Sequence, residues 1–272
     1  MPTVDANGCK MYYEIDDYTD PWVSGKEIVW LQHGVGRSSK FWYHWVPALA
    51  REYRVIRRDM RGHGQSSAPP SDHKWSLDEL AEDMLAFMDT LGLERVHYLG
   101  ESIGGIIGIL FATRWPERLK TLTICNSPTT LRRAEGEALS GSHGSVSKTL
   151  AQEGSRRWGR LLIERRVISG KSPAHINWVL NEWAETPVHV LQGVTRTLDG
   201  ADTGPLLPQV KVPTLILAPS RSPITSLSDQ IKMRTLIPNA RIAVVEGPGH
   251  EIYVDRAEEC IDAFLSFLSN PN

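Results

Sequence analysis

The most informative segment of this 272-residue chain is Tyr98-Leu99-Gly100-Glu101-Ser102-Ile103-Gly104-Gly105. A short β-prone run precedes it and an apolar, helix-like run follows it, as in a strand that turns at once into a helix. Gly100 and Gly104 leave room for the strained backbone of such a corner. The corner would lift the Ser102 hydroxyl clear of a sheet and set it at a helix N-terminus, which favours developing negative charge. Ser102 is therefore predicted to be a nucleophile, and the alternative is a glycine-rich turn with an unreactive serine.

Segments on both sides of this corner alternate between strand and helix patterns. Residues 28–32, 54–58 and 119–125 are predicted as strands, and residues 77–91 carry apolar side chains on one helical face behind a capping box. This alternation is typical of an α/β fold with a doubly wound, mostly parallel sheet.

The alternation stops after residue 128 and resumes near residue 206. Residues 129–205 contain charged, helix-prone pieces broken by glycine and proline, which predicts a helical cap inserted into a core formed by residues 1–128 and 206–272. Trp158, Trp178 and Trp183 lie in this insertion. They either fill a small cap core or roof a pocket, and Trp183 is taken as a substrate-contact candidate.

Two further loops follow predicted strands at the edge of the sheet where Ser102 is expected. The loop His33-Gly34-Val35-Gly36 would present backbone N–H groups to an oxyanion, with Val35 as the expected donor and Gly34 beside the substrate. Trp42, close to this loop, is a second pocket candidate. His250 ends the loop Glu246-Gly247-Pro248-Gly249-His250 and is predicted to be a general base.

The composition excludes several classes of partner. A formal net charge of −2 gives no electrostatic case for nucleic acid or an anionic membrane surface, so a small molecule is the expected partner. Three cysteines without C-x-x-C spacing argue against a disulfide framework or a structural zinc site. No apolar run approaches the length of a membrane span, and no histidine cluster has metal-ligand spacing. We therefore expect a cytoplasmic protein without metal or cofactor, and the sequence leaves its oligomeric state undefined.

Taken together, these motifs resemble the α/β-hydrolase superfamily. The resemblance rests on residues 33–36, the run Asp59-Met60-Arg61-Gly62-His63-Gly64-Gln65-Ser66, the G-x-S-x-G segment and residues 247–250, in the family's order. It implies that Ser102 is the nucleophile and His250 the base, and that the N–H groups of Val35 and Ile103 form the oxyanion hole. The insertion would correspond to the family's cap.

The chain departs from the family at the triad acid. The resemblance places a carboxylate either where Ser222 stands, before Pro223, or where Asn126 stands, after the strand of residues 119–125. One hypothesis is that Asn126 or Ser222 orients His250, so that only activated substrates react. A second is that another carboxylate substitutes, and a third is that hydrolysis has been lost. Four carboxylates are candidates for the second hypothesis: Asp199, Asp202, Asp229 and Glu246.

The function expected from the sequence is a serine hydrolase that cleaves a small, largely apolar ester or lactone through an acyl-enzyme on Ser102. Two alternatives stay open within the resemblance. One is a carbon–carbon bond hydrolase of ring-cleavage products, which needs the same serine, base and oxyanion hole. The other is a catalytically impaired member that binds a ligand.

Overall fold

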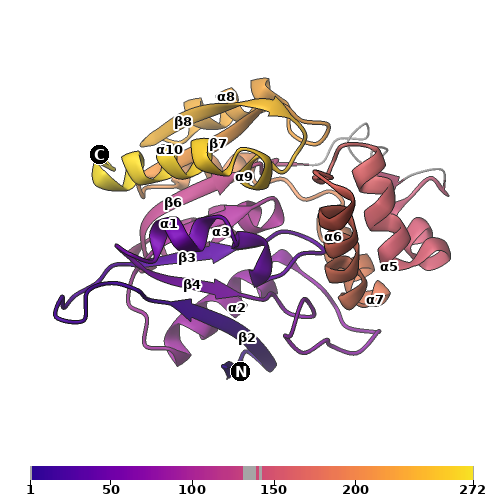
Figure 1. Cartoon of the computed structure of the whole chain (residues 1–272), viewed down its shortest axis with the longest axis horizontal. Coiled ribbons are helices and arrows are strands. Elements are labelled where there is room, and N and C mark those ends of the chain that lie inside the picture. Colours follow the sequence, from indigo (N-terminus) through magenta and orange to yellow (C-terminus); the bar gives the residue numbers. More distant parts are fainter. Residues whose placement is uncertain (1, 131–138, 141–142, 272) are drawn as a thin grey trace.

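The computed structural model describes residues 2–130, 139–140 and 143–271. Its centre is an eight-stranded sheet in the order β1-β2-β4-β3-β5-β6-β7-β8 (Figure 1). The pairs β1/β2 and β2/β4 are antiparallel, and all other neighbouring strands are parallel. The strands are β1 (Thr3–Ala6), β2 (Cys9–Asp16), β3 (Ile28–Gln32), β4 (Arg54–Arg58), β5 (Val96–Glu101), β6 (Leu119–Cys125), β7 (Thr214–Arg221) and β8 (Ala240–Pro248).

Helices cover both faces of this sheet, because the central parallel strands are apolar on both sides. Helix α1 packs against α10, and α2 packs against α3. The helices of the described core are η1 (Ser39–Trp42), α1 (Trp45–Leu49), α2 (Leu77–Thr90), α3 (Ile103–Arg114), η2 (Pro116–Arg118), η4 (Gly204–Gln209), α8 (Leu227–Leu236), α9 (Ile252–Asp255) and α10 (Ala257–Ser269). The predicted α/β fold with a mostly parallel, doubly wound sheet is confirmed.

Three helices lie together beyond one end of the strands (right in Figure 1): α5 (Val146–Glu164), α6 (Pro173–Glu185) and α7 (Val188–Arg196). They belong to the segment predicted as a cap, of which residues 131–138 and 141–142 lie outside the described residues. The two ends of that segment meet, since Thr130 forms a β-bridge with Asp202 and the N–H of Thr203 donates to the carbonyl of Thr129. The helices are thus inserted at one place in the chain. The division into core and cap domains stays a prediction.

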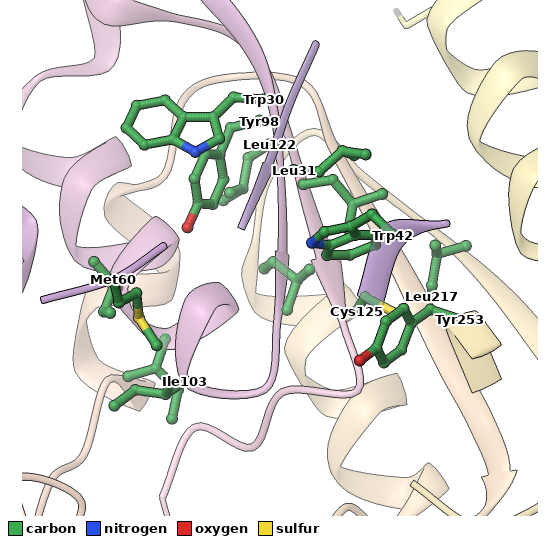
Figure 2. Close-up of a cluster of buried hydrophobic side chains, with 14 of the residues drawn as sticks. Trp30, Leu31, Trp42, Met60, Tyr98, Ile103, Leu122, Cys125, Leu217 and Tyr253 are labelled. Atoms are coloured by element: carbon green, nitrogen blue, oxygen red, sulfur yellow. The ribbon is translucent and has the colours of Figure 1, made fainter. Parts of the chain in front are cut away.

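Strand β5 sits in the middle of the sheet and carries the candidate nucleophile at its end. All six of its residues, Val96–Glu101, are buried. Tyr98 packs edge-on against Trp30 of β3, and both belong to the cluster in Figure 2. A strand held this tightly gives the residues that follow it fixed positions. Among the described residues, no helix has the length and apolar character needed to cross a membrane.

Candidate active site

The strand-to-helix corner at Ser102 has the strained geometry that the sequence predicts. Ser102 is the N-cap of α3 with φ 54° and ψ −119°, a conformation that non-glycine residues rarely adopt. The two glycines are needed, because a Cβ on Gly100 would lie 2.3 Å from the carbonyl oxygen of Gly104, and one on Gly104 would lie 2.9 Å from that of Gln32. The N–H of Ser102 donates to the carbonyl of Cys125 at the end of β6. The corner is therefore fixed on both sides.

The glycine loop after β3 lies beside this corner. His33 anchors it, since His33 Nε2 accepts a hydrogen bond from the N–H of Met60 (2.9 Å). A Cβ on Gly34 would lie 3.0 Å from the Cβ of Ser102, so the loop touches the nucleophile. Val35 lines the same pocket as Ser102, and Ile103 is the first residue of α3, so its N–H has no partner within the helix. These positions are compatible with the predicted oxyanion hole.

Ser102 and His250 line one pocket with about 510 Å³ of empty space, its mouth included. Its walls are mostly apolar and include Val35, Ile106, Trp158, Leu162, Trp183 and Ile224. Trp183 packs edge-on against Trp158 with 5.1 Å between ring centroids, and it lies over the guanidinium of Arg37 at 5.6 Å. Trp158 and Trp183 thus pack against each other among the inserted helices and also line the pocket. Trp178 packs elsewhere, against Phe41.

Trp42 does not line this pocket, contrary to the expectation from the sequence. It is fully buried in the core, between Trp45 at 5.5 Å and Tyr253 at 4.8 Å (Figure 2). Trp42 lies three residues before Trp45, and the two rings pack on each other in the core. Closeness to the glycine loop in the sequence therefore does not bring the Trp42 side chain to the pocket.

One nitrogen of His250 faces Ser222. The distance from His250 Nδ1 to Ser222 Oγ is 3.3 Å. Ser222 Oγ also accepts hydrogen bonds from the N–H groups of Ile224 (3.1 Å) and Thr225 (3.2 Å). A hydroxyl has two lone pairs and one proton, so only its proton is left for His250. Nδ1 therefore accepts, and the proton of the neutral imidazole sits on Nε2.

The other nitrogen faces a residue that the sequence reasoning passed over. His250 Nε2 lies 3.7 Å from Oε1 of Glu101, the residue before the nucleophile. Glu101 is completely buried, and neither of its carboxylate oxygens has a hydrogen-bond partner among the described residues. Burial raises the pKa of Glu101 to about 7; the charge of Glu251 adds to this rise, and Arg37 opposes it. Burial, together with Arg37, lowers the pKa of His250 to about 3, so His250 is neutral near pH 7.

A buried ionic link supports this side of the site. Arg37 Nε donates to Glu251 Oε1 (2.5 Å) and lies 4.0 Å from Glu101 Oε2. The other oxygen of Glu251 accepts from the N–H of Ser169, which lies between α5 and α6. The link therefore joins the loop after β3, the loop after β8 and the inserted helices.

The remaining acid candidates are not brought to His250. Asn126 follows β6 with φ 51°, is fully buried, and its side-chain amide has no hydrogen-bond partner within the described ranges. The four carboxylates proposed from the sequence have other surroundings: Asp199 is exposed, Asp202 accepts from the N–H of Gly204, Asp229 lies in the first turn of α8, and Glu246 pairs with Arg221. The described residues also contain no group of three or more metal-ligating side chains.

Comparison with known proteins places the chain in a family. Residues 27–257 match the family described as alpha/beta hydrolase fold, so the chain belongs to that family, as its motifs indicated. It is 27% identical over 247 residues to 3-oxoadipate enol-lactonase 1 of Acinetobacter baylyi, which is 88% of this chain and 88% of that protein. The similarity agrees with the expectation of a hydrolase that acts on ester or lactone bonds.

Solved structures agree on the fold. The enol-lactonase from Burkholderia xenovorans LB400 superposes with a TM-score of 0.88 at 23% identity, over 99% of this chain and 100% of that one. A hydrolase from Pseudomonas aeruginosa PA01 superposes with a TM-score of 0.80 at 26% identity, over 98% and 97% of the two chains.

Proposed function

We propose that this protein is a serine hydrolase of small, largely apolar esters or lactones. The observation that carries the proposal is the convergence of Ser102, at a strained strand-to-helix corner, and His250 on one apolar pocket. The enol-lactonase relative supports a lactone as one substrate class. The apolar walls favour an uncharged acyl group.

In the proposed reaction, Ser102 Oγ attacks the carbonyl carbon while its proton passes to His250 Nε2. The backbone N–H groups of Val35 and Ile103 hold the oxyanion. The C–O bond to the leaving group then breaks as its oxygen takes the proton from His250, and water later hydrolyses the acyl-enzyme by the same steps.

The state of His250 restricts the substrates. Its Nε2 must first lose the proton that the Ser222 contact places there, at the expense of a hydrogen bond worth about 1 kcal/mol. Among the described residues, Ser222 and no carboxylate lies at Nδ1 to offset the charge of the imidazolium that forms. We therefore expect good leaving groups, such as those of enol esters, enol lactones and aryl esters, and little activity on alkyl esters.

Labelling with a fluorophosphonate tests the proposal. Intact mass should show one label per wild-type chain, none in Ser102→Ala and labelling at least 100-fold slower in His250→Ala. If folded wild type resists both this reagent and a smaller sulfonyl fluoride, Ser102 is not an activated nucleophile. The ligand-binding alternative would then stand, favoured by the unusual proton position on His250.

A further inference from the structure

We propose that Glu101 is a positioning residue for His250: at the Nε2 edge of the imidazole, its carboxylate balances the charge that a triad acid would balance at Nδ1. The inference rests on the proposed function, because it assigns Glu101 a role in the proton transfer from Ser102. It concerns a residue inside the G-x-S-x-G segment.

The geometry of Glu101 and His250 supports an electrostatic interaction between the two side chains. Glu101 Oε1 lies 3.7 Å from His250 Nε2, the nitrogen that must take the proton of Ser102. Both side chains are buried, so water screens their interaction little. Glu101 is the last residue of β5, and its backbone is fixed by the pairing of Glu101 with Cys125 of β6.

The neighbouring carboxylates accept hydrogen bonds, whereas Glu101 accepts none from the described residues. Glu251 uses one oxygen on Arg37 and the other on the N–H of Ser169. Asp255 accepts from the hydroxyl of Ser169 (2.5 Å). Buried acceptors are normally satisfied by hydrogen bonds. In the described part of the chain, Glu101 has only long contacts, to Arg37 at 4.0 Å and to His250 at 3.7 Å, and the backbone of Gly34 beside it, so its carboxylate calls for a functional reason.

Gly34 makes room for this carboxylate. A Cβ at residue 34 would lie 2.2 Å from Glu101 Oε2. Any other residue in the glycine loop would therefore expel the carboxylate from its place.

The charges around Glu101 favour protonation of His250. The titratable groups that face Glu101 are Arg37 after β3, Cys125 on β6, His250 and Glu251 after β8, and Tyr253 on α9. One guanidinium serves two carboxylates, so this buried cluster carries one excess negative charge once Glu101 is ionised and while His250 is neutral. Transfer of the Ser102 proton to His250 balances the charge of the cluster. The negative charge then lies on the oxyanion, which the backbone N–H groups of Val35 and Ile103 are proposed to hold.

The test is the rate of fluorophosphonate labelling between pH 5.5 and 9 for wild type and Glu101→Gln. Ionisation of Glu101 should raise the wild-type rate as the pH passes through about 7, in line with its raised pKa. Glu101→Gln keeps the shape but cannot carry the charge. We expect it to react 10- to 100-fold more slowly than wild type at pH 8, with a flat profile. Glu246→Gln, an exposed residue on β8, is the matched control and should retain the wild-type profile.

A second variant separates charge balance from a packing role. Ser222→Asp supplies an acid at Nδ1. The labelling rate of the double variant Glu101→Gln/Ser222→Asp should therefore lie within about threefold of the rate of Ser222→Asp alone. Labelling of Glu101→Gln within twofold of wild type, with the rise near pH 7 intact, would overturn the inference and leave the proposed function in place. If Glu101→Gln does not fold, a Ser222→Asp profile that keeps the full rise near pH 7 would overturn it equally. Absence of wild-type labelling would instead contradict the proposed function.

Discussion

The two nitrogens of His250 face surroundings of opposite character. On the Nδ1 side, Ser222 is neutral and its oxygen is saturated by two backbone N–H groups of its own turn. On the Nε2 side, Glu101 is an acid without a hydrogen-bond partner in the described residues, at the end of the most deeply buried strand. On the Nδ1 side the hydrogen bonds are satisfied and no charge is supplied. On the Nε2 side a charge is supplied, but the buried carboxylate lowers the stability of the fold. The carboxylate that balances the charge of His250 can therefore lie at the Nε2 edge of the ring instead of the Nδ1 edge. The fold loses stability as a result.

The largest expected effect comes from restoring the acid on the neutral side. In Ser222→Asp, the carboxylate would accept from Nδ1–H and leave Nε2 free for the proton of Ser102. We expect the labelling rate and aryl ester turnover to rise about 100-fold, since replacing the triad acid of a serine protease by its amide costs about 10⁴-fold. Ser222→Asn is the control for shape without charge. If Ser222→Asp accelerates no ester, the missing acid does not limit the rate.

The second prediction concerns the stability of the charged side. The pKa of Glu101 is about 7 in the folded chain against the usual 4.5, so its ionisation destabilises the fold. This loss is absent below pH 4.5 and complete above pH 7. Glu101→Gln should therefore unfold with about 2 kcal/mol more free energy than wild type at pH 8, and about the same at pH 5.

Urea denaturation at the two pH values measures this difference. The full rise in pKa, which already includes the attraction to Arg37, corresponds to about 3 kcal/mol and sets the upper limit of this difference. Glu246→Gln should change the unfolding free energy by less than about 0.5 kcal/mol at both values. A destabilised Glu101→Gln at pH 8 would mean that the carboxylate is satisfied in the folded protein.

The smallest effect distinguishes two roles of Ser222. If its hydroxyl holds the imidazole proton on Nε2, Ser222→Ala removes a hydrogen bond worth about 1 kcal/mol that favours the unproductive form. The labelling rate should then rise about fivefold, although two backbone N–H groups lose their acceptor. A decrease would show that Ser222 orients His250 productively.

Much of this arrangement could be predicted from local sequence. The residues around Ser102, the glycine loop and the turn at His250 each follow a strand of a parallel sheet, and the carboxyl ends of such strands meet at one edge. The glycines are informative for the same reason, since Gly34 and Gly100 admit no Cβ in their surroundings. Periodicity and turn chemistry were sufficient for these features.

The rest depended on contacts that local patterns do not encode. Trp42 was misplaced because its closeness to the glycine loop in the sequence does not fix the direction of its side chain, which packs in the core. Glu101 was not among the predicted acids, because the family pattern places the acid in a loop after a later strand, at Asn126 or Ser222. A signal was present: a carboxylate at the end of a strand whose six residues are all predicted to be buried is unusual and indicates a function. Its partner could be found only from the fold, because His250 is 149 residues further on.

The link from Arg37 through Glu251 to Ser169 has a consequence for how molecules reach the pocket. If the inserted helices moved away from the sheet as a lid, Ser169 would lose its hydrogen bond to the buried Glu251 carboxylate, at a cost of about 1.5 to 3 kcal/mol. We therefore expect substrate entry to depend on rotations of single pocket-lining side chains, such as Trp183 and Ile224. The size of the substrates that reach Ser102 would then be set by the width of a fixed pocket entrance rather than by the extent of a hinge motion.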